Sequence, residues 1–118
     1  MAVPCFIEFR LPIRKLDVIS EIFMERIFVI EDELHCEPQE GQFSTLEEAV
    51  IELRRRAIAP WDAKPNEAPC MNWRNCGRRY EIIEYDISET PWKELRRMPA
   101  LEVSARGAHW LGDFRTVA

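Results

Sequence analysis

Residues 60–77 have no hydrophobic periodicity, although a helical pattern precedes them and a strand pattern follows. Pro60, Pro65 and Pro69 interrupt the segment, and proline continues neither a helix nor a central strand. Loops of this length are uncommon in compact domains and are usually either functional or disordered. The Trp and Cys residues in the segment argue against disorder. We therefore predict a long ordered loop at 60–77 and expect functional residues there.

The segment before this loop has the clearest helical pattern in the chain. Its apolar side chains recur at the spacing that places them on one face of a helix. Ser44 and Glu47 have the spacing of a capping box, in which both side chains satisfy backbone amides at the helix start. Pro60 stops the pattern, because a proline inside a helix removes a hydrogen bond and clashes with the preceding turn. The pattern predicts a helix over 45–58.

The remaining elements are predicted from shorter patterns. Thr90 and Pro91 suit the N-cap and the first position of a short helix. Apolar side chains on both faces of 78–87 are typical of a central strand. A bend at Gly107 lets residues 108–111 continue the last strand or pack back on it. We predict strands over 3–11, 26–34, 78–87 and 101–106, and further helices over 13–25 and 91–98.

This order of elements is typical of a small α+β domain. We predict one domain over residues 1–118, with about four mostly antiparallel strands. Two main helices and one short helix would pack on one face of that sheet, and the loop at 60–77 would add to it.

The distribution of charge limits the classes of partner. The net charge is −5, and nucleic-acid binding needs a basic surface for the phosphates, so we do not expect a nucleic-acid partner. Residues 31–53 hold eight acidic and no basic side chains, whereas 54–80 hold seven basic and two acidic ones. Much of this asymmetry matches the dipole of the predicted helix. The alternative is a basic patch at the loop that meets an anionic partner.

The sequence also gives an expectation about location. The first residues lack the basic start and the apolar run of a cleavable signal. No apolar stretch approaches the roughly 18 residues that would cross a membrane. We therefore expect a cytoplasmic protein without a membrane partner.

Two cysteines in the loop raise the question of metal binding. Cys70 and Cys76 have five residues between them, and zinc sites more often have two to four. A complete zinc site would need two further ligands, for instance Cys36 with His35 or His109. Because disulfides are rare in the cytoplasm, we expect free thiols first. Zinc is the one cofactor we consider, and a disulfide that closes the loop is the other alternative.

No set of residues predicts catalysis. A thiolate at Cys70 or Cys76 would need a base such as His109, and no known motif surrounds these residues. Glu84 and Asp86 share one strand face, where we expect salt bridges to nearby arginines rather than acid–base chemistry. We therefore favour a protein without catalytic activity and keep a metal-dependent or thiol enzyme as the alternative.

The loop and the residues after it are the predicted binding surface. Trp73 and Arg74 lie at the expected loop tip, and Trp and Arg are enriched at binding hot spots. Asn66 is expected to form a turn through its side chain, and Gly77 to adopt a positive φ. The predicted partner-binding residues are Trp61, Asn66, Trp73, Arg74, Arg78 and Arg79.

Three functions follow from these patterns. The first is a non-catalytic binding or regulatory module that contacts a protein or an anionic ligand through residues 60–79. The second is a small acidic inhibitor, such as a toxin antidote or a phage-type anti-defence protein, which would act through the acidic segment 31–40. The third is a Cys/His metal or thiol site in the 70–76 loop, which as a metal-dependent or thiol enzyme would use Cys70, Cys76 and His109.

Overall fold

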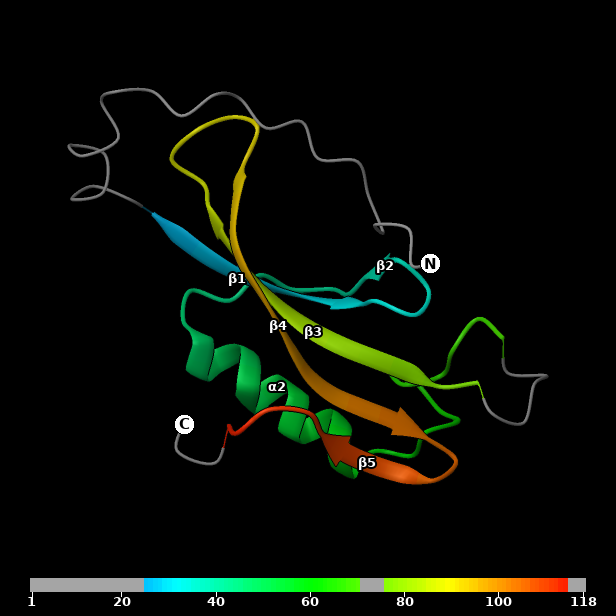
Figure 1. The fold of residues 1–118 in the computed structure, drawn as a ribbon. Helices are drawn as coiled ribbons and strands as arrows, with labels where there is room; N and C mark the ends of the chain where they lie inside the picture. The colour runs from blue at the N-terminus through cyan, green and yellow to red at the C-terminus, as the bar shows by residue number, and fades with distance from the viewer. Residues whose placement is uncertain (1–24, 71–75, 115–118) are drawn as a thin grey trace.

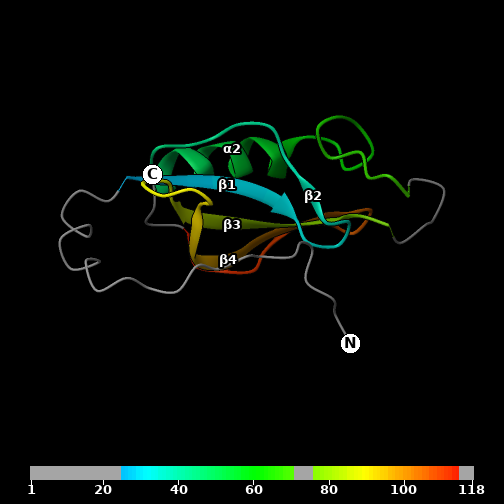
Figure 2. The same cartoon turned by 90° about the horizontal axis from the view of Figure 1, so that it is seen from above.

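The computed structural model describes residues 25–70 and 76–114. Within these residues the strands form one five-stranded sheet in the order β2-β1-β3-β4-β5, and every adjacent pair is antiparallel (Figure 1). One helix, α2, lies along one face of this sheet (Figure 2). The elements are β1 (Arg26–Asp32), β2 (Glu37–Pro38), α2 (Leu46–Ile58), β3 (Arg78–Asp86), β4 (Lys93–Ser104) and β5 (Gly107–Trp110).

The core lies between α2 and the sheet. Val50 and Leu53 of α2 are fully buried, as the helical pattern of the sequence requires. The strand residues of this core are Phe28, Ile30, Tyr80, Ile82, Ala100, Leu101 and Val103. β3 occupies the centre of the sheet and has buried side chains on both faces, so the prediction of a central strand at 78–87 is confirmed.

The predicted helix at 45–58 is confirmed, with a cap one residue later than expected. Thr45 is the N-cap, and its hydroxyl oxygen accepts a hydrogen bond from the backbone N–H of Glu48 at 3.1 Å. The Glu48 carboxylate in turn accepts from the backbone N–H of Ser44 at 3.2 Å. The two bonds resemble a capping box, in which each side chain accepts from a backbone amide at the helix start. The side chains that accept are those of Thr45 and Glu48, and not the predicted pair Ser44 and Glu47.

The fold class predicted from the sequence is wrong. The described residues hold one helix and a five-stranded antiparallel sheet, rather than two main helices, a short helix and about four strands. The predicted strand at 26–34 is confirmed as β1, and the chain packs back after Gly107 as β5. The strand predicted at 3–11 and nearly all of the helix predicted at 13–25 lie outside the described residues.

The short helix predicted at 91–98 is a strand. Residues from Lys93 onward belong to β4, where the Arg96 side chain donates to the Glu84 carboxylate of β3 at 2.7 Å. Such cross-strand pairs require the extended conformation, and they outweigh the local helix signal at Thr90 and Pro91.

Pro99 lies within β4, in a strand that pairs on both sides. It pairs with Glu81 at a shift in register between β3 and β4. Such irregular positions tolerate proline, because the ladder is locally interrupted there. This explains how a residue that breaks most strands lies inside the longest one described.

No helix in the part of the chain that the structure describes is long and apolar enough to span a membrane.

Asn66 ties the loop to the end of α2. It is 1% exposed, and its side-chain amide donates to the carbonyls of Arg56 at 2.8 Å, Pro60 at 3.2 Å and Ala59 at 3.3 Å. Its side-chain oxygen accepts from the Tyr80 hydroxyl of β3 at 2.9 Å. The Arg56 carbonyl also accepts from the backbone N–H of Ala59 at 3.2 Å, and the Ala59 and Pro60 carbonyls lie beyond the helix. One loop residue therefore caps the helix end and joins it to the sheet.

We predict that Asn66→Ala lowers the free energy of unfolding by about 1–3 kcal/mol, because buried carbonyls and the Tyr80 hydroxyl lose their partner. Urea denaturation measures this loss. Gln42→Ala, at an exposed position, is the control and should change the free energy by less than about 0.5 kcal/mol. Equal stability of the two variants would contradict the capping role.

An ion-pair cluster lies on the sheet face away from α2. The guanidinium of Arg97 contacts the carboxylates of Glu81, of Glu94 at 2.7 Å and of Glu31 at 3.4 Å. Glu81 is 3% exposed. Burial raises the pKa of Glu81 from its ordinary value of 4.5 to about 7, although Arg97 acts in the opposite direction; nearby Glu33 adds to the rise.

This raised pKa predicts a pH dependence of stability. Between about pH 4.5 and 7 the folded chain holds a proton on Glu81 that the unfolded chain has lost, so the free energy of unfolding falls as the pH rises through that window. Glu81→Gln should flatten this slope in urea denaturation at several pH values. Glu102→Gln, which changes a carboxylate paired with Arg79 on the same face, should keep it. An unchanged slope in Glu81→Gln would contradict the assignment.

Candidate functional site

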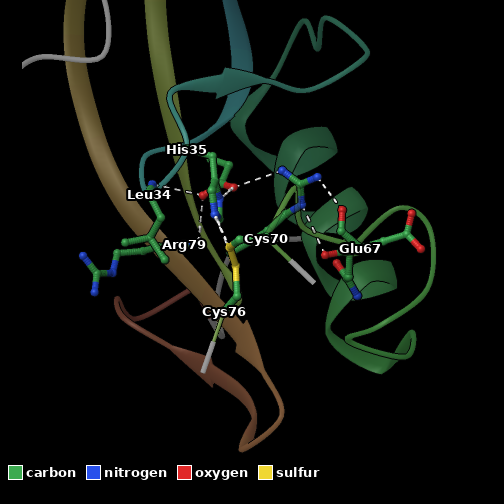
Figure 3. Close-up of a disulfide and its surroundings, with 9 residues drawn as sticks. Leu34, His35, Glu67, Cys70, Cys76 and Arg79 are labelled. Carbon is green, nitrogen blue, oxygen red and sulfur yellow. Dashed lines mark hydrogen bonds and ion pairs between the residues drawn. A yellow bond between two sulfur atoms is a disulfide. The ribbon is translucent and has the colours of Figure 1, made fainter. Parts of the chain in front are cut away.

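Three chain segments meet at a histidine and two cysteines (Figure 3). His35 comes from the turn between β1 and β2, Cys70 from the loop after α2, and Cys76 from the residues just before β3. The His35 Nε2 lies 3.0 Å from the Cys70 Sγ and 3.4 Å from the Cys76 Sγ. The two sulfurs form a disulfide in this structure. The first expectation, free thiols at both positions, is therefore wrong for this form of the chain, and the disulfide alternative is what it contains.

A buried carboxylate orients the histidine. Asp32 is 0% exposed, and its Oδ2 accepts from His35 Nδ1 at 2.5 Å and from Arg78 Nη1 at 3.0 Å. Its Oδ1 accepts from the backbone N–H groups of Leu34 at 3.0 Å and Arg79 at 3.1 Å. An ionised carboxylate only accepts hydrogen bonds, so the His35 proton lies on Nδ1. In the neutral ring, Nε2 then presents its lone pair to the two sulfurs.

Arg78 holds the loop against the first strand. Besides its ion pair with Asp32, its side chain donates to the backbone carbonyls of Asn66 at 3.2 Å and Glu67 at 2.6 Å. It also pairs with the Glu37 carboxylate of β2 at 3.1 Å. The guanidinium therefore joins β1, β2 and the loop that leads to Cys70, as its fixed array of donors allows.

Gly77 lets the chain next to Cys76 approach β4. A Cβ atom at Gly77 would lie 2.4 Å from the Val103 carbonyl oxygen and 2.8 Å from the Ser104 Cβ, closer than atoms can approach. Any side chain here would push Cys76 away from the sheet. The predicted positive φ at Gly77 is wrong, since the described glycines with positive φ are Gly41 and Gly107. The constraint is close packing instead.

The donor set matches a zinc ion. The imidazole nitrogen and the two sulfurs all lie within 4.8 Å of one another. In tetrahedral zinc coordination, ordinary bond lengths place a nitrogen and a sulfur ligand about 3.6 Å apart. The 3.4 Å separation from Cys76 is close to this value and the 3.0 Å separation from Cys70 is shorter, so coordination needs the disulfide to open by reduction and the Cys70 sulfur to move away from the ring.

The other sequence-predicted ligands lie apart from this cluster. His109 is on β5, paired with Glu102 of β4, and is exposed. Cys36 follows His35 directly, is exposed and has a φ of 51°. Among the described residues, the candidate metal-binding group consists of His35, Cys70 and Cys76.

The predicted partner-binding residues differ in how far they are buried, and two of them lie outside the described residues. Trp61 packs against the core cluster, and Asn66 and Arg78 are buried within the chain's own contacts. Arg79 is half-buried and pairs with the carboxylates of Glu33 at 2.9 Å and Glu102 at 3.2 Å. Trp73 and Arg74 lie outside the described residues.

Asp32 is the site residue that the sequence analysis missed. Strand alternation in β1 places Asp32 on the same face as the core residues Phe28 and Ile30. A carboxylate on a core face needs partners, because an unpaired buried charge is costly. The signal was available: an acidic residue on the apolar face of a strand, three residues before a histidine.

No protein-family model, curated protein or solved structure matches this chain.

We predict that Asp32→Asn lowers the free energy of unfolding by about 3–5 kcal/mol, because it removes the buried counter-charge of the Arg78 guanidinium and leaves it only the more exposed carboxylate of Glu37. Asparagine keeps the shape and one oxygen acceptor, so the loss reports the removed charge together with the acceptor that the amide NH2 group replaces. Urea denaturation of the variant measures it. Glu33→Gln, which alters a partly exposed ion pair with Arg79, should cost less than about 1 kcal/mol. Similar losses in both variants would contradict the importance of the buried pair.

Proposed function

We propose that the reduced chain is a zinc-binding module, with the ion held by His35 Nε2 and by the thiolates of Cys70 and Cys76. The observation that carries this proposal is the direction of the His35 ring. Its Nδ1 is occupied by a fully buried carboxylate, and its Nε2 faces both sulfurs at 3.0 Å and 3.4 Å. Two soft thiolates and one imidazole favour zinc over calcium or magnesium, which prefer oxygen ligands.

The role of Asp32 in this proposal is to hold the ligand, not to bind the ion. Histidines that bind metals usually donate their other ring N–H to a carboxylate or carbonyl, which fixes the tautomer and the ring orientation. Asp32 accepts from His35 Nδ1 at 2.5 Å, and its other contacts keep it in place. A histidine in this position is thus ready to coordinate without rearrangement.

In the disulfide form, neither sulfur can donate a hydrogen bond to the same His35 nitrogen. A disulfide has no hydrogen to donate, so the lone pair of the His35 Nε2 has no donor in either sulfur. A metal ion between the three atoms satisfies the nitrogen and both thiolates together. This difference favours a metal-binding role for the arrangement over a purely structural disulfide.

The bound ion would join parts of the fold that are far apart in sequence. The ligands come from the β1–β2 turn, the loop after α2 and the start of β3. Metal-binding free energy adds to folding free energy when the unfolded chain has no preformed site. Three protein ligands leave the fourth position of a tetrahedral ion for water or a further ligand.

The first function predicted from the sequence, contact with a protein or an anionic ligand through residues 60–79, stays a prediction. Two of its residues, Trp73 and Arg74, lie outside the described part of the chain. Arg78 and Asn66 already serve the chain's own contacts, so the described residues favour the metal-binding alternative.

The acidic inhibitor also receives less support than the metal site. In the segment 31–40, Asp32 and Glu31 are buried, and their carboxylates pair with Arg78 and Arg97. Carboxylates that are paired inside the chain contribute little to an acidic surface for a basic partner.

Zinc binding by the reduced chain tests the proposal. We expect one zinc ion per chain in native mass spectrometry after reduction, and tetrahedral cobalt absorption when Co²⁺ replaces zinc. His35→Ala, Cys70→Ser and Cys76→Ser should each lose this binding, because each removes a ligand. Asp32→Asn should weaken it about 10–100-fold, because the ring loses its orienting partner.

Cys36→Ser and His109→Gln are the matched controls, since both change a residue of a ligand type outside the cluster. Both should bind zinc as the unchanged chain does. A reduced chain that takes up no zinc, or a His35→Ala variant that binds it equally well, would overturn the proposal.

A further inference from the structure

We propose that a hydroperoxide expels the zinc ion by oxidising Cys70 and Cys76 to the disulfide that the structure contains. This inference rests on the zinc binding proposed above and adds its regulation. The site would bind metal when reduced and release it when oxidised, with one pair of sulfurs serving both states.

The two states exclude each other because they use the same atoms. Each sulfur is either a thiolate that coordinates the ion or one half of the disulfide. The Cα atoms of Cys70 and Cys76 are 5.8 Å apart, within the range that disulfides span without movement of the backbone. Two thiolates on one zinc ion lie about 3.8 Å apart, a separation that rotation of the two side chains provides.

The exposure of the two sulfurs sets the order of the chemistry. Cys76 is 9% exposed, whereas Cys70 is more accessible, so the Cys70 thiolate meets peroxide first. With hydrogen peroxide as the hydroperoxide, it attacks one peroxide oxygen, the O–O bond breaks, and hydroxide leaves while Cys70 becomes a sulfenic acid. The Cys76 thiolate then attacks the Cys70 sulfur, the S–S bond forms, and a second hydroxide leaves. Two electrons pass from the sulfurs to the peroxide, and two protons convert the hydroxides to water.

Loss of both thiolates leaves His35 as the one remaining ligand of the three. A single imidazole holds zinc weakly, so the ion leaves when the S–S bond forms. A thiol reductant reverses the change by thiol–disulfide exchange and restores both thiolates.

The support around the site does not depend on the state of the sulfurs. Asp32 makes its contacts to His35, Arg78 and two backbone amides without either cysteine. The ring of His35 therefore keeps its direction in both states. This lets the site take up zinc again after reduction without rebuilding its geometry.

Titration of the reduced, zinc-loaded full chain with hydrogen peroxide tests this inference. A chromophoric chelator measures released zinc, and peptide mass mapping measures the Cys70–Cys76 disulfide. We expect one zinc ion released per disulfide formed, and recovery of binding after treatment with a thiol reductant. Cys36→Ser is the control and should behave as the unchanged chain does, because Cys36 lies outside the cluster.

A second variant tests the order of the steps. Cys76→Ser in the Cys36→Ser background leaves Cys70 without a nearby partner sulfur, so sulfenic acid should accumulate at Cys70 and react with a dione trapping reagent. Cys70→Ser in the same background should give much less trapped product at Cys76, because that sulfur is buried.

The outcomes separate the two proposals. Zinc that loads and then stays bound through complete peroxide treatment overturns the switch and leaves the zinc module standing. Zinc released without a Cys70–Cys76 disulfide also overturns the switch. A reduced chain that never loads zinc overturns both proposals.

Discussion

Asp32 lies on the core face of β1, where an ionised carboxylate costs free energy unless its acceptor positions are filled. Two side chains and two backbone amides fill them in this fold. The same set of contacts fixes the β1–β2 turn, the start of β3 and, through Arg78, the loop after α2. The position of each segment in the candidate site therefore depends on contacts to one buried carboxylate.

This arrangement separates the part of the site that changes from the part that does not. In the proposed switch, the sulfurs of Cys70 and Cys76 would carry the redox and metal chemistry. The Asp32–Arg78 pair and the capping by Asn66 hold the segments that bring those sulfurs to His35. A site supported in this way needs little reorganisation between its two states, which is the condition for a reversible response.

Local patterns of the sequence predicted some elements well and others badly. The α2 helix and the central position of β3 follow from periodicity, since core burial imposes that periodicity directly. The second half of β4 was predicted as the strand at 101–106, but its first half was missed. That half is stabilised by pairs with β3, such as Arg96 with Glu84, that no local pattern contains. The mistaken helix at 91–98 shows how a Thr-Pro start signal misleads when long-range pairing decides the conformation.

The candidate site was predicted in part. Cys70 and Cys76 were considered as ligands from residue type, although zinc sites more often have a shorter spacing, and Cys36 with His35 or His109 was named as an example of the further ligands. The choice between the two histidines depends on strand order, because β1 lies next to β3 and the turn after β1 meets the start of β3. Arg78 and Asn66 were expected to face a partner, whereas tertiary contacts bury both. The sequence places polar residues in a loop and leaves open whether they point inward.

X-ray absorption at the zinc edge of the reduced, zinc-loaded chain would identify the atoms bound to the ion. We expect two sulfur ligands at about 2.3 Å and an imidazole nitrogen at about 2.0 Å, with the imidazole signal lost in His35→Ala. A spectrum with oxygen and nitrogen ligands alone, or one that His35→Ala leaves unchanged, would contradict the proposed zinc site.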